Sequence, residues 1–143
     1  MFTWTHEHSF EVDIPQAKAW DIFMDMNNWL RWIDDVEAFE FDHPLKKGSI
    51  AKGKVKKFSI PFIFTEIIPP KEFRFLLKTL FLIRQESFGE IQELSPTRSR
   101  IVSKITVKSI LCPFLKGHMT KNLAKQYSKM EHAFLEMAQE NGS

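Results

Sequence analysis

The stretch VDIPQAKAWDIF (residues 12–23) decides the fold of this chain, together with WLRW (residues 29–32) shortly after it. An alternating strand pattern ends at Pro15, a residue that the first turn of a helix accepts because its missing N–H needs no partner there. Ala19, Trp20, Ile22 and Phe23 supply the buried side of that helix. Asn27-Asn28 ends it and caps a second short turn, in which Trp29 and Trp32 share a face.

The first strand alternates with a strict period of two. One face carries Trp4, His6, His8, Phe10, Val12 and Ile14, whereas the other carries Thr5, Glu7, Ser9, Glu11 and Asp13. Such a pattern indicates a strand with one face buried against the core and the other exposed to solvent, as in an antiparallel sheet.

Five or six further strands are expected between the two short helices and the end of the chain. Turn signals such as Gly48, Pro69-Pro70 and Ser95-Pro96-Thr97 separate them. Their expected ranges are Val36–Phe41, Ile50–Lys57, Ile60–Ile68, Glu72–Leu77, Leu80–Leu94 and Arg100–Ser109. The range Ile60–Ile68 is apolar on both faces, so either a second subunit covers its outer face or the strand contains a bulge.

About thirty residues from Cys112 form one long terminal helix, opened by Pro113 and ended by Asn141-Gly142. At about 100° per residue, one third of its circumference is apolar, and the opposite side is charged. The apolar side comprises Leu115, Met119, Leu123, Tyr127, Met130, Phe134 and Met137, and the charged side comprises Lys121, Lys125, Lys129, His132 and Glu136. A stripe this long and narrow indicates packing against a sheet.

Length and composition narrow the classes of protein. A chain of 143 residues is expected to form a single domain over residues 1–143. The single cysteine excludes an internal disulfide, no apolar run is long enough for a membrane span, and no signal peptide is visible, which together favour a cytoplasmic location. A net charge of +2, with lysines taken as spread along the chain, does not favour a nucleic-acid partner.

These elements resemble the START-like (SRPBCC) helix-grip superfamily, and most closely its polyketide cyclase/dehydrase-type branch. The matching residues are Ile14-Pro15, Ala19–Phe23, Asp25, Trp29–Trp32, Gly48-Ser49, Thr65–Pro70 and Glu93–Pro96. The resemblance implies an α+β fold: a curved antiparallel sheet of six or seven strands wrapped around a long C-terminal helix, with two short helices after the first strand. It also implies a cavity for sterols, lipids, polyketides, quinones or hormones; some members of the superfamily catalyse cyclisation.

Polar residues on expected inward faces are the candidates for ligand contact. His6 and His8 point to the same side of one strand, where imidazoles can begin a metal site, but no third ligand is evident and no metal is predicted. Gln126 lies inside the apolar arc of the terminal helix, and Gln85, Ser87 and Ser103 lie on inward strand positions. Each needs a hydrogen-bond partner, which a ligand or water in a cavity could provide.

The sequence therefore predicts a non-catalytic binder of a hydrophobic small molecule, held in an internal cavity of at least about 300 Å³ between sheet and terminal helix. The alternatives are a polyketide cyclase/dehydrase-type enzyme, and an interaction protein that uses an aromatic outer sheet face, with a homodimer as one outcome. No cofactor and no catalytic residue are predicted. The expected ligand-binding residues are His6, His8, Phe73, Phe75, Gln85, Ser87, Ser103, Met119, Leu123, Gln126, Tyr127 and Met130.

Overall fold

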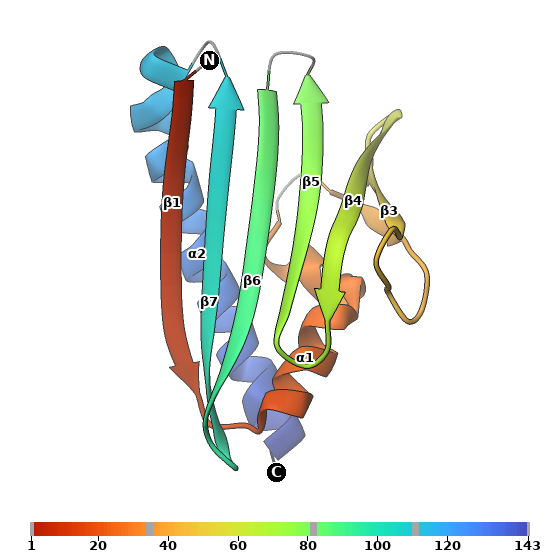
Figure 1. Cartoon of the computed structure of the whole chain (residues 1–143), viewed down its shortest axis with the longest axis vertical. Helices are drawn as coiled ribbons and strands as arrows, with labels where there is room; N and C mark the ends of the chain where they lie inside the picture. Colours follow the sequence, from red (N-terminus) through yellow and green to blue (C-terminus); the bar gives the residue numbers. More distant parts are fainter. Residues whose placement is uncertain (1, 34–35, 81–82, 110–111, 143) are drawn as a thin grey trace.

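One antiparallel sheet of seven strands and one long helix dominate the computed structural model, which describes residues 2–33, 36–80, 83–109 and 112–142. Within these ranges, side chains are not described for residues 2, 78–80, 83, 109, 112–120 and 141–142. The strand order across the sheet is β1-β7-β6-β5-β4-β3-β2. The predicted helix-grip arrangement is therefore confirmed (Figure 1).

The elements follow the predicted order. They are β1 (Phe2–Val12), α1 (Gln16–Met24), the 3₁₀ helix η1 (Met26–Arg31), β2 (Ala38–Glu40), β3 (Ile50–Val55), β4 (Phe58–Ile68), β5 (Glu72–Leu80), β6 (Ile83–Ser95), β7 (Arg98–Ser109) and α2 (Cys112–Gly142). The predicted strand Val36–Phe41 is too long, because only three of its residues pair with β3.

Helix α2 runs behind the sheet in Figure 1 and packs mainly against β1. Its buried side, from residue 121 onward, contains Tyr127, Met130, Ala133, Phe134, Met137 and Ala138. The predicted charged side is exposed, from Lys121 to Glu136. Leu115 and Met119 belong to the predicted apolar side, but their side chains lie outside the described residues.

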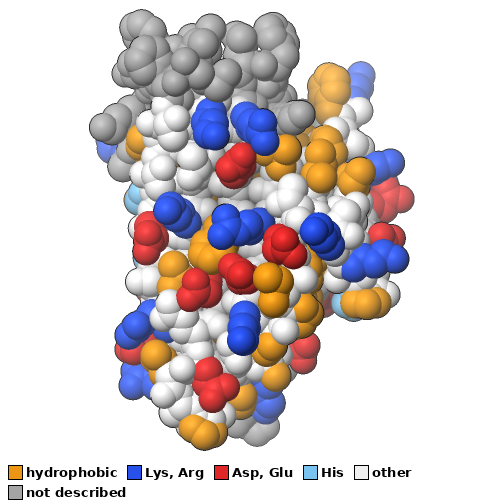
Figure 2. Space-filling view, viewed as in Figure 1, with side chains coloured by type: hydrophobic (Ala, Val, Ile, Leu, Met, Phe, Trp, Pro, Cys, Tyr) orange, Lys and Arg blue, Asp and Glu red, His pale blue; other side chains and the backbone are white. Residues whose placement is uncertain are grey.

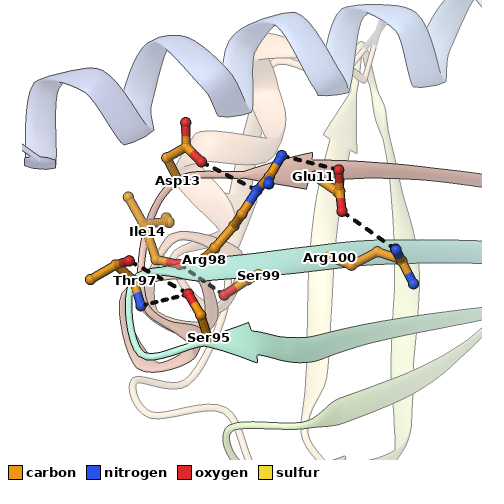
Figure 3. Close-up of polar contacts among 8 residues, drawn as sticks. All are labelled: Glu11, Asp13, Ile14, Ser95, Thr97, Arg98, Ser99 and Arg100. Carbon is orange, nitrogen blue, oxygen red and sulfur yellow. Dashed lines mark hydrogen bonds and ion pairs between the residues drawn. The ribbon is translucent and has the colours of Figure 1, made fainter.

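The entry into α1 is held by β7 and β6. Ser99 on β7 donates from its buried Oγ to the carbonyl oxygen of Ile14 at 2.8 Å, and Gln16 donates from Nε2 to the carbonyl oxygen of Ile91 at 2.8 Å. Figure 3 shows Glu11 on β1 between Arg98 and Arg100, at 3.1 and 3.4 Å. These contacts direct the chain from the sheet edge to its inner face.

Two details of the short helices differ from prediction. Pro15 is the N-cap of α1 rather than its first helical residue, with ψ of 153° in the extended region. The cap of η1 is Asp25, whose side chain accepts a hydrogen bond from the backbone N–H of Asn27 at 3.1 Å, so the asparagines follow the cap instead of forming it.

A bulge in β4 accounts for part of its two-sided apolar pattern. The pairing register between β4 and β5 shifts between Phe64 and Glu66. Beyond the shift, Ile67 pairs with the buried Phe73 and packs against the core, although the uninterrupted alternation would direct it outward. The bulge, one of the two explanations left open by the sequence, is therefore present, whereas a second subunit over the outer face stays a prediction.

Within the described part of the chain, no helix combines the length and apolar character needed to cross a bilayer.

Candidate functional site

A cavity of about 210 Å³ lies between the inner face of the sheet, the two short helices and α2. Its walls come from α1 and η1, from β4 to β7, and from α2. The lining residues are Phe23, Trp29, Trp32, Ile33, Phe62, Phe73, Phe75, Leu77, Gln85, Ser87, Phe88, Gly89, Ser103, Lys104, Ile105, Gln126, Tyr127 and Met130. This volume is smaller than the predicted minimum of about 300 Å³.

Aromatic rings fill the rest of that space. The Trp29 indole packs against five phenylalanine rings at centroid distances of 5.4 to 6.3 Å, namely Phe39, Phe62, Phe64, Phe73 and Phe75. Its Nε1–H donates to the carbonyl oxygen of Phe23 at 2.8 Å, which fixes the indole and satisfies its one polar atom. The many phenylalanines of this chain thus build a solid half of the core beside the cavity.

The part of the lining next to these rings carries polar side chains. Cross-strand neighbours on the inner face run from β7 and β6 toward β5 as Ser103–Gly89–Phe73 and as Ile105–Ser87–Phe75. Gln85 donates from Nε2 to Ser87 Oγ at 3.4 Å, while Gln126 approaches from α2. Among the described residues, the side chains of Ser103 and Gln126 have no hydrogen-bond partner. The cavity therefore has an aromatic side and a polar side.

Tyr127 connects the cavity to β1. Its ring lies parallel to the imidazoles of His6 and His8, with centroid distances of 5.4 and 5.5 Å and interplanar angles of 10° and 6°. His8 Nε2 in turn lies 3.3 Å from Glu131 Oε1. Burial raises the pKa of the Tyr127 phenol above its ordinary value of 10.0. The phenol is therefore neutral near pH 7 and able to donate a hydrogen bond.

Most of the predicted site residues meet at this cavity. Eight of the twelve line it: Phe73, Phe75, Gln85, Ser87, Ser103, Gln126, Tyr127 and Met130. His6 and His8 face α2 as predicted, but they stand behind Tyr127 and do not line the cavity; Leu123 is half-buried against the core and does not line it either. The side chain of Met119 lies outside the described residues.

Sequence reasoning missed the lining residues that come from α1, from η1 and from the two residues after η1. Phe23, Trp29, Trp32 and Ile33 were expected to be core or were not considered as ligand contacts. Trp29 and Trp32, which share one helical face, were the available signal for these contacts. Two neighbouring exposed tryptophans would be unusual, and a buried pair must face the sheet. Phe62, Leu77, Gly89 and Ile105 were also missed, together with Phe88 and Lys104, whose side chains alternate with the inward ones.

The chemistry that this lining offers is limited. Among its described residues there is no carboxylate and no imidazole, and Lys104 and Tyr127 are the titratable ones. No group of three or more His, Cys, Asp or Glu side chains able to hold a metal ion occurs among the residues that the structure describes. The lining can bury apolar surface and exchange hydrogen bonds with a few oxygen or nitrogen atoms.

A second hollow, of about 240 Å³, lies on the outer face of the sheet over β5, β6 and β7. Three of its charged groups contact neighbours: Arg84 pairs with Glu86 at 3.3 Å, and the Arg74 guanidinium lies 4.5 Å from the centroid of the Phe88 ring. Arg84 and Glu86 are exposed, as predicted from their alternation, and they stay outside the internal cavity.

Neither a protein-family model nor a curated protein sequence matches this chain. Solved structures, however, match it over nearly its whole length. A point mutant of norcoclaurine synthase from Thalictrum flavum, in complex with a transition state analogue, has 11% sequence identity and a TM-score of 0.76, covering 99% of this chain and 98% of that chain.

Two further structures give similar agreement. An aromatase/cyclase from Streptomyces sp. R1128 has 12% identity and a TM-score of 0.76, covering 99% of this chain and 97% of the other. Ara h 8.0201 has 12% identity and a TM-score of 0.67, with 94% and 99% covered. This chain therefore has the fold of the START-like, helix-grip proteins, as the sequence predicted. At such identities the likeness concerns the fold alone.

Proposed function

We propose that this chain binds a compact hydrophobic small molecule, of the polyketide or quinone kind, in the cavity between the sheet and α2, without catalysis. The observation that carries the proposal is the mixed lining: fixed aromatic rings on β4, β5 and η1 lie beside polar side chains on β7 and α2 that have no hydrogen-bond partner among the described residues. Apolar burial supplies most of the affinity in such a site, and a few polar groups orient the ligand. A volume of about 210 Å³ favours a ring-containing molecule over a long acyl chain.

Binding can be tested by filling the cavity from its polar side. Ser103→Leu adds an apolar side chain at an inward position of β7, whereas Thr106→Leu makes the same kind of change at an outward position of that strand. We expect an anilinonaphthalene sulfonate probe to lose its enhanced fluorescence with Ser103→Leu and to keep it with Thr106→Leu. Equal probe binding by both variants would place the probe elsewhere and remove the support for an internal site.

A native mass spectrum of the purified chain is the complementary test. A co-purified molecule that is retained by Thr106→Leu and lost from Ser103→Leu would identify the ligand class directly.

A polyketide cyclase or dehydrase is the second candidate, and the likeness to the Streptomyces aromatase/cyclase favours it. In that case Tyr127 would be the group in the cavity that donates a proton or hydrogen bond to a reacting carbonyl, because its phenol is neutral. Turnover of an aromatic polyketide analogue that disappears with Tyr127→Phe, while probe binding persists, would decide for the enzyme.

The homodimer and the cytoplasmic location stay predictions. An outward apolar row of Ile50, Ile63 and Leu76 crosses β3, β4 and β5, and Ile50 is 51% exposed. The mass of the chain in solution, compared between wild type and Ile50→Lys, tests whether this row joins two copies.

A further inference from the structure

The positive charge of this chain is concentrated in one segment. Between Asp42 and Glu66 there are six lysines and no acidic residue: Lys46, Lys47, Lys52, Lys54, Lys56 and Lys57. The rest of the chain contains fourteen basic residues and all eighteen acidic ones, so its net charge is −4. The overall net charge of +2 is therefore the sum of two parts of opposite sign. The expectation that the lysines are spread along the chain is wrong for this segment.

The β3–β4 hairpin brings three of these lysines to a projecting tip, made of residues 54–58. Val55 pairs with Phe58, which leaves Lys56 and Lys57 as the two-residue turn. The cross-strand neighbours of Lys54 are Ala38 and Ser59, neither of which is acidic, whereas Lys52 lies opposite Glu40. None of the three tip lysines has an ion pair with a described residue.

Two features of the tip are unfavourable for an isolated hairpin. Phe58 is 76% exposed, the most exposed of the large hydrophobic side chains that the structure describes. Lys56 has φ of 55°, in the left-handed region that suits glycine or asparagine better than lysine. An exposed phenylalanine and a lysine in a strained position are both explained if the tip contacts a partner that accepts apolar and cationic groups together.

The inner face of β4 continues from this tip into the cavity. Phe58, Ile60, Phe62 and Phe64 point to the same face, and their exposure falls from 76% at Phe58 through a half-buried Ile60 to 4% at Phe62 and 0% at Phe64. Phe62 lines the cavity. Figure 2 shows hydrophobic and basic side chains together at the corner where Figure 1 places the end of this hairpin.

We infer that the β3–β4 tip is a docking surface for an anionic lipid bilayer. The interfacial region of a bilayer accepts an aromatic ring, while anionic headgroups attract lysines at the same depth. Charge complementarity alone would also fit nucleic acid, but an exposed Phe58 at the centre of the lysines adds nothing to phosphate contacts in a duplex. The docking does not depend on the proposed ligand, because the tip lies outside the cavity.

Vesicle binding of the full chain tests this inference. The two vesicles are phosphatidylcholine alone and an equal mixture of phosphatidylcholine and phosphatidylserine, compared by co-sedimentation. We expect binding to the mixed vesicles only, weakened by added salt because the charges at the tip are exposed. Lys56→Asn combined with Lys57→Gln should weaken that binding about 25-fold, since each lysine near an anionic surface contributes about fivefold.

Two further variants separate the roles of charge, ring and fold. Lys121→Gln combined with Lys125→Gln removes the same charge from the exposed side of α2 and should leave vesicle binding close to wild type. Phe58→Ser should weaken it by about tenfold, as the loss of one buried aromatic side chain predicts. Lys56→Asn fits the left-handed turn, so thermal unfolding should show a folded protein in every case.

Three results would overturn the inference: no binding to the mixed vesicles, wild-type affinity in Phe58→Ser, or an equal loss with the α2 control pair. Binding of a DNA duplex without binding of vesicles would also overturn it, and would assign the lysines to nucleic acid. Failure of the cavity test with Ser103→Leu would leave the vesicle result untouched, so the two proposals fail separately.

Discussion

The ring of Phe73 occupies the position that a side chain at residue 89 would need: a Cβ atom built on Gly89 lies 2.4 Å from Phe73 Cζ. The two residues are cross-strand partners on β5 and β6, and both line the cavity. Glycine at position 89 thus lets the Phe73 ring lie flat across the neighbouring strand, where Trp20, Phe23 and Trp29 pack against it.

Gly89→Ala is expected to destabilise the fold by about 1–3 kcal/mol, because the Phe73 ring must leave a well-packed position. The open direction is the cavity, so probe binding should fall as well. Urea unfolding and the fluorescence titration measure the two effects. Gly53→Ala is the control: its Cβ would meet Phe39 and Phe62 at 3.2 Å, a contact that smaller shifts relieve. Equal stability of the Gly89→Ala variant and wild type would contradict the placement of Phe73.

Trp20→Ala is expected to cost about 3–5 kcal/mol, the range for large aromatic deletions in cores. Trp20 is 8% exposed on the inner side of α1, and its ring meets Phe73 edge-on at a centroid distance of 6.2 Å. Chemical denaturation measures the loss. A cost below about 1 kcal/mol would mean that α1 does not pack on the sheet as described.

Ser99→Ala should cost about 1–3 kcal/mol, because it leaves the buried carbonyl of Ile14 without its donor. Arg100→Ala, on the exposed side of the same strand, should cost less than about 1 kcal/mol, as expected for an exposed ion pair. Urea unfolding midpoints measure both losses. A larger loss in Arg100→Ala than in Ser99→Ala would contradict the role given to the Ser99 hydrogen bond.

Stability should fall as pH rises above 10, and Tyr127 should be one cause. Its pKa is raised in the folded state by burial, so the neutral phenol stabilises the fold fully below the ordinary value of 10.0. Above that pH the unfolded chain ionises first, and the contribution is lost. Because Tyr127 is the sole tyrosine, the ultraviolet band of phenolate reports on it alone. Phenolate absorbance that appears near pH 10 while the protein is still folded would contradict the prediction.

Gln126→Leu should separate apolar from polar recognition. A hydrophobic probe should bind the variant as it binds wild type, whereas a natural ligand with oxygen functions should lose about 1–3 kcal/mol of binding free energy. His6→Phe and His8→Phe should have smaller effects, because these imidazoles reach the cavity only through Tyr127. Unchanged affinity for the natural ligand in Gln126→Leu would show that Gln126 is structural.

Most of the fold could be predicted from local sequence patterns. The alternation of β1 and the apolar stripe of α2 were readable because each depends on a fixed period. The bulge at Phe64–Glu66 was one of two readings, since a single inserted residue and a covered outer face produce the same apolar pattern. Asp25 was missed as a cap because Asn27-Asn28 carries the same type of signal two residues later.

The candidate site was harder to predict from the sequence than the fold. Inward strand positions such as Ser87 and Ser103 follow from alternation, but the contribution of Trp29 and Trp32 depends on how η1 folds back over the sheet. His6 and His8 were placed on the right face, yet the Tyr127 ring stands between them and the cavity. The predicted cavity volume was too large because the number of phenylalanines does not indicate whether their rings surround an empty space or fill it.

The division of the cavity into an aromatic side on β5 and a polar side on β7 has a consequence for selectivity. If the proposed ligand binds there, we expect it to lie with its rings toward Phe73 and Phe75 and its oxygen atoms toward Ser103 and Gln126, because all four residues line the cavity. Two positional isomers of equal size and equal hydrophobicity would then bind with different affinities, because in one of them an oxygen atom meets only aromatic carbon. We expect the cavity to discriminate by the position of a substituent on a ring rather than by the size of the ring system.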